Sequence, residues 1–267
     1  MSKLVKNYCN FPSSVRRPMW RIWHNLLIRF DDETSANFMN YGYESLNGDP
    51  RLELKEKDEP NRYGIQLYNY VVKEADIKNK SVLEVGSGRG GGASFITRYY
   101  KPKKYVAVDI SSKIIEFCNN FYDDEGLKFV KGRAEDLPLE DNSFDVVVNV
   151  ESARCYSDLM VFFKEVRRVL KPGGQFMFAD MIENHEVDDV KEKLMQAGFK
   201  IEKENDITDN VVKALDKDSL RREELINKKV PGFLKSSFLQ FAGAQGTERY
   251  NAFKTKKFHY YTFVLSN

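Results

Sequence analysis

Short apolar runs alternate with amphipathic stretches from about residue 80 onward. The apolar and β-branched runs predict strands near residues 81–86, 104–109, 127–131, 143–150, 174–183 and 199–201, and a last strand over the aromatic segment 257–265. The amphipathic stretches predict helices between these strands, at 93–100 and 187–197 among others. Strands that alternate with helices are typical of a parallel sheet wound on both faces. The expected fold class is therefore α/β.

A glycine-rich turn follows the first predicted strand. Residues 81–92 read SVLEVGSGRGGG, and glycines can adopt positive φ and carry no Cβ to keep a ligand from the backbone. Gly86, Gly88 and Gly91 fit the dinucleotide-binding spacing G-x-G-x-x-G, whereas Gly86, Gly88 and Gly90 fit G-x-G-x-G. In open α/β sheets a nucleotide binds at this turn, beyond the carboxyl end of the first strand. The segment therefore predicts a nucleotide site, and both spacings stay open.

Two acidic residues narrow the choice of nucleotide. Asp109 ends the second predicted strand, where its carboxylate can bind the two hydroxyls of a ribose. Nicotinamide cofactors and S-adenosylmethionine (SAM) both carry that ribose. Glu84 lies two residues before the first glycine, and a carboxylate there suits a cationic amino-acid tail better than a pyrophosphate. Because SAM has an ammonium and a sulfonium but no phosphate, the pair favours SAM.

Three later segments resemble class I SAM-dependent methyltransferases. Residues 132–138 (GRAEDLP) and 142–149 (NSFDVVVN) are similar to their adenine loop and fourth strand, and residues 169–174 (VLKPGG) to the helix end before the fifth strand. The resemblance implies a Rossmann-like sheet of seven strands with an antiparallel last strand, SAM as cofactor and S-adenosylhomocysteine (SAH) as product. A dehydrogenase would use the same first turn and Asp109, but the sequence shows neither a second nucleotide-binding unit nor a catalytic pair for it.

A closer resemblance covers nearly all of the chain after residue 35. Residues 38–43 (FMNYGY), 83–94 (LEVGSGRGGGAS), 149–156 (NVESARCY) and 241–246 (FAGAQG) together resemble the phthiotriol dimycocerosate methyltransferase family and its fatty-acid O-methyltransferase relatives. In that family SAM methylates an oxygen of a long-chain lipid or polyketide. The resemblance therefore implies a hydrophobic small-molecule acceptor.

The motifs and the resemblance together give the expected site residues. The expected cofactor contacts lie in the segment 38–43, on the glycine turn and at or after the strand ends: Tyr41, Glu84, Gly86, Ser87, Gly88, Gly90, Asp109, Ile110, Ala134, Glu135, Val150 and Glu151. The expected acceptor contacts are Tyr43, Arg154, Tyr156 and Gln245. Arg154 and Gln245 are the expected catalytic residues, since Gln245 can donate to the acceptor oxygen. No metal site is expected.

Two positions depart from the family pattern. Arg133 replaces an aspartate that accepts from the adenine amino group, which leaves the backbone of Ala134 and the carboxylate of Glu135 for that contact. Arg154 replaces a histidine, and an arginine stays protonated, so it cannot act as a general base. A carboxylic acid, with a pKa near ~4, is already ionised at neutral pH and needs no base.

Arg154 thus favours one class of acceptor. A guanidinium can orient a carboxylate by a charge-assisted, bidentate contact, so the expected reaction is O-methylation of the carboxylate of a fatty or isoprenoid acid. The alternatives are hydroxyl or phenol O-methylation of a lipid or polyketide, C- or N-methylation of a small metabolite, and a non-catalytic SAM-binding protein.

Two segments outside the α/β core read as helical and are expected to cover the acceptor site. They are residues 1–70, an N-terminal lid, and residues 208–250, an insertion in a methyltransferase domain that spans 71–267. Residues 19–30 form a basic amphipathic pattern. That pattern fits a lid helix packed on the domain, or else a helix in weak contact with a membrane surface.

Composition and net charge limit the classes of binding partner that the sequence predicts. The 267 residues include 42 Lys+Arg and 40 Asp+Glu, and a net charge of +2 gives no drive toward nucleic acid or an anionic membrane. Three widely spaced cysteines indicate neither a disulfide framework nor a zinc motif. No apolar run approaches the ~20 residues that span a bilayer. A cytoplasmic location is expected, and no pattern indicates an oligomeric state.

Overall fold

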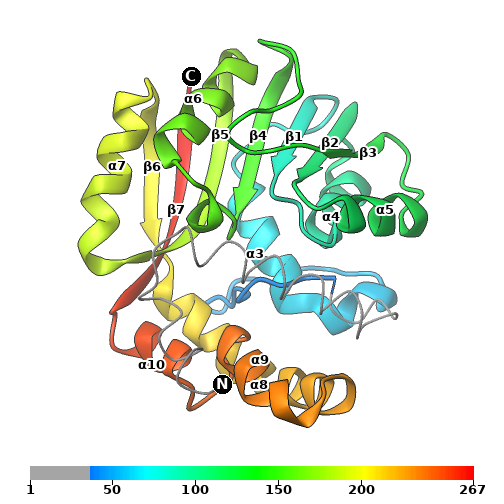
Figure 1. Cartoon of the computed structure of the whole chain (residues 1–267), viewed down its shortest axis with the longest axis vertical. Helices are drawn as coiled ribbons and strands as arrows, with labels where there is room; N and C mark the ends of the chain where they lie inside the picture. The colour runs from blue at the N-terminus through cyan, green and yellow to red at the C-terminus, as the bar shows by residue number, and fades with distance from the viewer. Residues whose placement is uncertain (1–36) are drawn as a thin grey trace.

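Seven strands form one mixed sheet in the order β3-β2-β1-β4-β5-β7-β6 (Figure 1). The computed structural model describes residues 37–267. The strands are β1 Ser81–Val85, β2 Lys104–Asp109, β3 Leu127–Lys131, β4 Phe144–Val150, β5 Leu170–Glu183, β6 Lys200–Asp206 and β7 Phe258–Ser266. Neighbouring strands from β3 to β5 pair in parallel, whereas β7 is antiparallel to both β5 and β6. The predicted α/β sheet with an antiparallel last strand is confirmed.

Helices cover both faces of the sheet. They are η3 Glu56–Asn61, α3 Arg62–Val72, α4 Gly91–Tyr100, α5 Ser112–Phe121, η4 Ala153–Cys155, α6 Leu159–Val169, η5 Asn184–Glu186, α7 Val187–Gln196, α8 Thr208–Lys229, α9 Gly232–Phe241 and α10 Glu248–Lys254. Successive strand residues point to opposite faces, so Val82 packs in one hydrophobic cluster with Ile65 of α3, while Leu83 packs in another with Phe162 of α6. Within residues 37–267, no helix is both long and apolar enough to cross a membrane.

Three element boundaries differ from the prediction by more than one residue, and the first is the end of β6, which lies at Asp206 rather than at residue 201. Helix α4 begins at Gly91 rather than at residue 93, because Gly90, with a φ of 78°, already forms its N-cap. Strand β5 begins at Leu170 rather than near residue 174, because the register between β4 and β5 shifts by a bulge after the pair Phe144 and Leu170. Gly173 lies in this bulged part with a φ of 75°. The segment that resembles a helix end thus contains the end of α6 at Val169 and the irregular first part of β5.

The predicted lid segments are only partly helical. Residues 37–55 contain no helix, contrary to the expectation for 1–70, because Gly42 has a φ of 85° and Tyr43 N donates to Tyr63 O of α3 at 3.0 Å. A Cβ on Gly42 would lie 3.0 Å from Tyr63 Cβ, so the extended chain lies directly on α3. The amphipathic pattern at 19–30 lies outside the described residues. The helices predicted within 208–250 are present as α8, α9 and the first part of α10.

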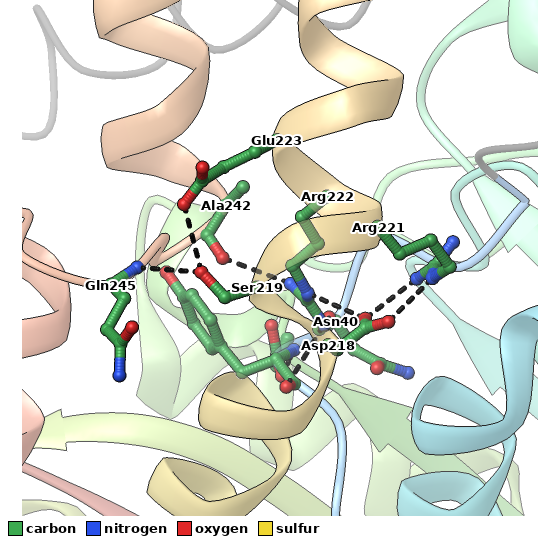
Figure 2. A network of polar contacts seen from close by, with 10 residues as sticks. Asn40, Asp218, Ser219, Arg221, Arg222, Glu223, Ala242 and Gln245 are labelled. Atoms are coloured by element: carbon green, nitrogen blue, oxygen red, sulfur yellow. Dashed lines mark hydrogen bonds and ion pairs between the residues drawn. The ribbon is translucent and has the colours of Figure 1, made fainter.

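Arg222 of α8 joins the two lid segments at the end of the sheet where α8, α9 and α10 gather (Figure 1). Its guanidinium donates to Asn40 O and Tyr41 O, both at 3.1 Å, and to Ala242 O at 3.0 Å. Asp218, buried on the same helix, accepts from Arg222 Nε at 2.8 Å, and Figure 2 shows the whole network. One side chain therefore brings residues 40–41 and 242 together.

Candidate functional site

A cavity of about 810 Å³ opens at the carboxyl ends of the parallel strands. Its sheet side is lined by the glycine turn after β1 and by the residues that follow β2, β3 and β4. Its other side is lined by residues 37–41 and by two residues of the C-terminal lid segment, Phe241 and Arg249. The cavity thus lies at the place where the sequence predicts the nucleotide and the acceptor.

The glycine turn adopts the G-x-G-x-G form. Gly86, Gly88 and Gly90 have positive φ values of 79°, 50° and 78°, whereas Gly91 already lies in α4. The backbone N–H groups of Gly86 and Ser87 both donate to Val108 O, at 2.8 and 3.0 Å. Because these donors are used inside the protein, the turn offers few N–H groups to a pyrophosphate. This favours SAM over a dinucleotide.

A cluster of polar side chains, Asn149, Ser152 and Tyr156, packs against the glycine turn at the end of β1. Asn149 Nδ2 donates to Val85 O at 2.9 Å and to Ser152 Oγ at 2.7 Å, and Ser152 Oγ lies 2.8 Å from Tyr156 Oη. A Cβ on Gly86 would lie 2.3 Å from Ser152 Oγ. Tyr156 lines the cavity, as expected, but its hydroxyl belongs to this cluster. Sequence reasoning missed Asn149 and Ser152, although both lie in the quoted motif 149–156.

Asp109 lies in the cavity wall beside the turn. Its Oδ2 accepts from Gly88 N at 3.1 Å and its Oδ1 from Ser111 N at 2.9 Å. Burial raises the pKa of Asp109 to about 6, although the backbone donors oppose the shift. The carboxylate therefore has the position and the acceptor oxygens that the hydroxyls of a ribose require. Together with the glycine turn, Asp109 fits SAM.

The remaining expected cofactor contacts divide into two groups. Those that line the cavity, besides the turn and Asp109, are Tyr41, Ile110, Ala134, Glu135, Val150 and Glu151. Gly90 does not line it, and a Cβ there would lie 2.7 Å from Phe129 Cζ, so its role is to let α4 begin close to the sheet.

Glu84 lies behind the cavity wall rather than in it. The side chain is fully buried, and its two oxygens accept from the hydroxyls of Tyr68 at 2.7 Å and Tyr105 at 3.1 Å. Burial raises the pKa of Glu84 to about 7. β1 is buried along its length, so a side chain at this position meets α3 instead of the ligand. At this place the cavity wall is formed by Tyr68, and the carboxylate of Glu84, which the sequence predicted to face the cofactor, lies behind it.

Glu151 joins the end of β4 to the N-terminal lid segment. It has a φ of 53°, and its Oε1 accepts from Tyr41 N at 2.8 Å and from Tyr260 Oη at 2.9 Å. Burial raises the pKa of Glu151 to about 8. Tyr41 packs edge-on against Phe253 of α10, with ring centroids 5.0 Å apart. A carboxyl group in the cavity wall therefore holds the backbone of the lid.

Replacing Glu151 with glutamine is expected to raise Tm at pH 8. A folded pKa of about 8, above the unfolded value of 4.5, means that the wild type loses stability as the pH rises from 4.5 through 8. Glutamine stays neutral and keeps an oxygen for Tyr41 N. The difference in Tm between variant and wild type should therefore shrink toward zero as the pH falls to 5. Glu140→Gln, at an exposed position, is the control, and a Tm difference independent of pH would contradict this account.

Arg154 lies at a charged corner of the cavity with three residues that the sequence did not single out, Asp180, Met181 and Arg249. Arg154 Nη1 donates to Met181 Sδ at 3.3 Å, and Arg249 Nη1 donates to the same sulfur at 3.1 Å. Asp180 is buried, and its oxygens accept from the backbone N–H groups of Arg154 at 3.2 Å and Met181 at 2.7 Å. Burial raises the pKa of Asp180 to about 6, against the opposing charge of Arg154.

Two of the expected acceptor contacts lie elsewhere. Tyr43 is outside the cavity lining and stacks on Tyr70, with ring centroids 4.4 Å apart. Gln245 is exposed, and its Nε2 donates to Asp216 Oδ1 at 3.1 Å. Gly243 and Gly246, with φ values of 62° and 81°, turn this loop toward α8, so that Gln245 N donates to Ser219 Oγ at 3.3 Å (Figure 2). Tyr43 and Gln245 therefore do not line the cavity in this structure.

Comparison with known proteins agrees with this geometry. Residues 83–178 match a family model described as a methyltransferase domain. The chain is 37% identical over 238 residues to the phthiotriol/phenolphthiotriol dimycocerosates methyltransferase of Mycobacterium tuberculosis (strain ATCC 25177 / H37Ra), with 88% of this chain and 87% of that protein covered. It is 37% identical over 229 residues to the fatty-acid O-methyltransferase of Mycolicibacterium smegmatis (strain ATCC 700084 / mc(2)155), with 85% and 82% covered.

Solved structures share the fold at low sequence identity. Geranyl diphosphate methyltransferase in complex with SAM has a TM-score of 0.61 and 17% identity, over 85% of this chain and 97% of that one. The [4+2]-cyclase SpnF has a TM-score of 0.65 and 17% identity, over 85% and 86%. A cyclase on the same fold means that fold alone does not decide the reaction, but the close relatives and the cofactor site do. The chain is a SAM-dependent class I methyltransferase and belongs to the family of the phthiotriol/phenolphthiotriol dimycocerosates methyltransferases.

Proposed function

We propose that this methyltransferase esterifies the carboxylate of a hydrophobic acid, such as a fatty or isoprenoid acid. The observation that carries the proposal is Arg154, which lines the cavity that also contains the glycine turn and Asp109. When bound, SAM would supply a methyl group on a positively charged sulfur. An oxygen nucleophile can take that methyl group, and SAH is then the leaving group. The part of this chain is then to hold an ionised oxygen in line and to keep water away.

The charge state of the acceptor decides what the protein must provide. A carboxylate reaches the site already ionised, so no residue has to remove a proton, and Arg154 can orient both oxygens through its fork of N–H donors. The apolar side chains of Phe38, Met39 and Phe241 in the cavity wall suit the hydrocarbon part of such an acid. The name of the relative from Mycolicibacterium smegmatis, a fatty-acid O-methyltransferase, supports the same substrate class.

Hydroxyl O-methylation is the second candidate, and Asp180 favours it. An alcohol must lose a proton as it attacks, and a base with a pKa near the working pH is the most effective one. Asp180 lines the cavity, and its pKa of about 6 gives it that property. The phthiotriol-methylating relatives, named for an alcohol, are consistent with this candidate.

Turnover of labelled SAM with dodecanoic acid and with dodecanol tests both candidates. For carboxylate methylation, Arg154→Lys should lower kcat/KM for the acid by about tenfold or more, because the charge stays but the fork is lost. SAH affinity should stay near wild type, and Arg154→His should not restore use of the acid. Arg221→Lys, an α8 arginine outside the cavity lining, is the control.

The two candidates predict opposite effects of Asp180→Asn on turnover. If the acceptor is a carboxylate, this variant removes a like charge and should keep or improve use of the acid. If the acceptor is an alcohol, it removes the base and turnover of the alcohol should be lost. Turnover of the alcohol alone, abolished by Asp180→Asn and raised by Arg154→His, would overturn the proposed carboxylate methylation.

We also propose that the two lid segments act together over the acceptor. Residues from both line the cavity, and Arg222 donates to the backbone of each. Closure of such segments excludes water from the reacting pair. The domain division, with 1–70 and 208–250 as lid and 71–267 as the methyltransferase domain, is part of this proposal.

A further inference from the structure

We infer that the hydroxyl of Tyr68 binds the ammonium group at the amino-acid end of the cofactor, and that the buried Glu84 acts through this hydroxyl. Tyr68 is then the binding residue, and Glu84 is the positioning residue behind it. The inference goes beyond the proposed function, because it concerns the cofactor and holds for any acceptor. It gives a role to the carboxylate of β1, which does not itself line the cavity.

Tyr68 lies between Glu84 and the cavity. Its hydroxyl donates to Glu84 Oε1 at 2.7 Å, and the tyrosine lines the cavity wall. The other carboxylate oxygen of Glu84 accepts from Tyr105 Oη of β2 at 3.1 Å, and Tyr105 does not line the cavity. Glu84 itself is fully buried. The Tyr68 hydroxyl is therefore the group through which this carboxylate can act on a bound ligand.

The ring of Tyr68 is held in one orientation from two sides. A Cβ on Gly92, in the first turn of α4, would lie 2.1 Å from Tyr68 Cζ, so the ring packs directly on the start of that helix. Phe38 of the N-terminal lid segment packs edge-on against the ring, with centroids 5.9 Å apart. A hydroxyl fixed in this way is preorganised for a ligand that enters the cavity.

The order of the strands indicates which end of the cofactor lies near Tyr68. Residues 131–135, after β3, line the cavity on one side of Asp109, where the adenine is expected. β1 lies on the other side of β2, and Glu84 pairs there with Ala107. In SAM the ribose joins the adenine to the sulfur and its amino-acid end. With the ribose at Asp109 and the adenine toward β3, the amino-acid end lies toward β1 and Tyr68.

The hydrogen-bonding capacity of the Tyr68 hydroxyl suits an ammonium group. A phenol has one donor and can also accept. Because its hydrogen is directed to Glu84, the hydroxyl offers its lone pairs to the cavity. An ammonium group has three donors and no acceptor, whereas the carboxylate at the same end of SAM can only accept. The hydroxyl can therefore bind the ammonium group and not the carboxylate.

The charges around this hydroxyl favour a cation as well. Burial, and then the charges of Glu84 and Glu151, raise the pKa of Tyr68, so the phenol stays neutral. Burial raises the pKa of Glu84 to about 7, and an ammonium group nearby would favour its ionised form. An ionised Glu84 in turn makes the Tyr68 oxygen a better acceptor, since linked hydrogen bonds polarise one another. Arg89, the cation of the glycine turn, lies over the ring of Phe117 of α5, 4.6 Å from the centroid.

Calorimetry with SAH and with 5′-methylthioadenosine tests the inference, because methylthioadenosine has the adenine, ribose and sulfur of SAH but no amino-acid end. Tyr68→Phe removes the hydroxyl and keeps the ring on Gly92. We expect SAH affinity to fall about tenfold or more, as for a hydrogen bond to a charged group, while methylthioadenosine affinity stays near wild type. Tyr100→Phe is the matched control, because its hydroxyl donates to Asn69 of α3 and it does not line the cavity.

Glu84→Gln tests whether Glu84 acts through Tyr68. Glutamine keeps an oxygen for the Tyr68 hydroxyl but carries no charge, so SAH affinity should fall by less than in Tyr68→Phe. In the double variant, SAH affinity should equal that of Tyr68→Phe alone, since the effects of two residues that share one contact do not add. Methylthioadenosine affinity should stay near wild type in each variant, which shows that the adenosine site is still folded.

Four results would contradict the inference, and none of them depends on which acceptor the enzyme methylates. Equal loss of SAH and methylthioadenosine affinity in Tyr68→Phe would show that Tyr68 only supports the cavity wall, and would overturn it. Unchanged SAH affinity would overturn it as well. A loss confined to SAM, with SAH unaffected, would mean that the hydroxyl faces the sulfonium instead of the ammonium group. Losses of the two single variants that add in the double variant would contradict the role of Glu84.

Discussion

Replacing Gly86 with alanine is expected to lower SAH affinity by ~100-fold or more. The new Cβ would lie 2.3 Å from Ser152 Oγ and 2.5 Å from Ser152 Cβ, at a backbone φ of 79°. Ser152 would have to leave its contacts with Val85 O and Tyr156, and the glycine turn would shift with it. A positive φ adds ~1 to 3 kcal/mol of strain for a residue with a side chain. Calorimetry with SAH gives the affinity.

Gly48→Ala isolates the contribution of strain alone. Gly48 has a φ of 72°, and a Cβ there would have nothing within 4 Å. This control should lower Tm while SAH affinity stays near wild type. If Gly86→Ala bound SAH as tightly as Gly48→Ala does, the turn would tolerate a side chain and the close approach of Ser152 would have no functional meaning.

Replacing Asp109 with alanine is expected to lower SAH affinity by about tenfold to 100-fold, the range for a charged hydrogen-bond partner. The variant removes the acceptor for the ribose hydroxyls and also the acceptor for Gly88 N. Because burial raises the pKa of Asp109 to about 6, SAH affinity of the wild type should fall as the pH drops below 6. Asp109→Asn keeps one oxygen but does not ionise, so its SAH affinity should be low and should not vary with pH.

Asp123→Asn, at an exposed position in the loop before β3, is the matched control for this series. It should bind SAH as the wild type does at every pH. A wild-type SAH affinity that stays constant between pH 5 and 8 would mean that the ionised Asp109 carboxylate makes no contact with the cofactor.

The sheet and the cofactor turn were predictable because their signals are local. A buried strand followed by glycines needs only adjacent residues to be recognised, and Asp109 marks the end of the next strand. Glu84 was harder to place, because its position depends on Tyr68 of α3, which packs across the sheet face. A pattern within β1 does not say whether a polar side chain faces the ligand or a neighbouring helix.

The acceptor side depends on contacts between distant parts of the chain. Arg249 reaches Met181 only through the packing of α10 on β7, and no local pattern distinguishes it from other arginines. Gln245 lies outside the cavity lining because the direction of its loop is set by Gly243 and Gly246, whose positive φ values turn it toward α8. Asp180 was within reach of sequence reasoning, since it is a carboxylate late in a predicted strand, as Asp109 is.

The place of β7 in the sheet sets an order of assembly during synthesis. Strands β1 to β5 can pair with one another as they leave the ribosome, whereas β6 has β7 as its neighbour and must wait for residues 258–266. The cofactor turn is therefore complete early, while Arg249 and the backbone around Ala242 join the acceptor side late. A nascent chain can form the SAM site well before it has an acceptor wall, and early SAM binding would then stabilise the half of the sheet that is already made.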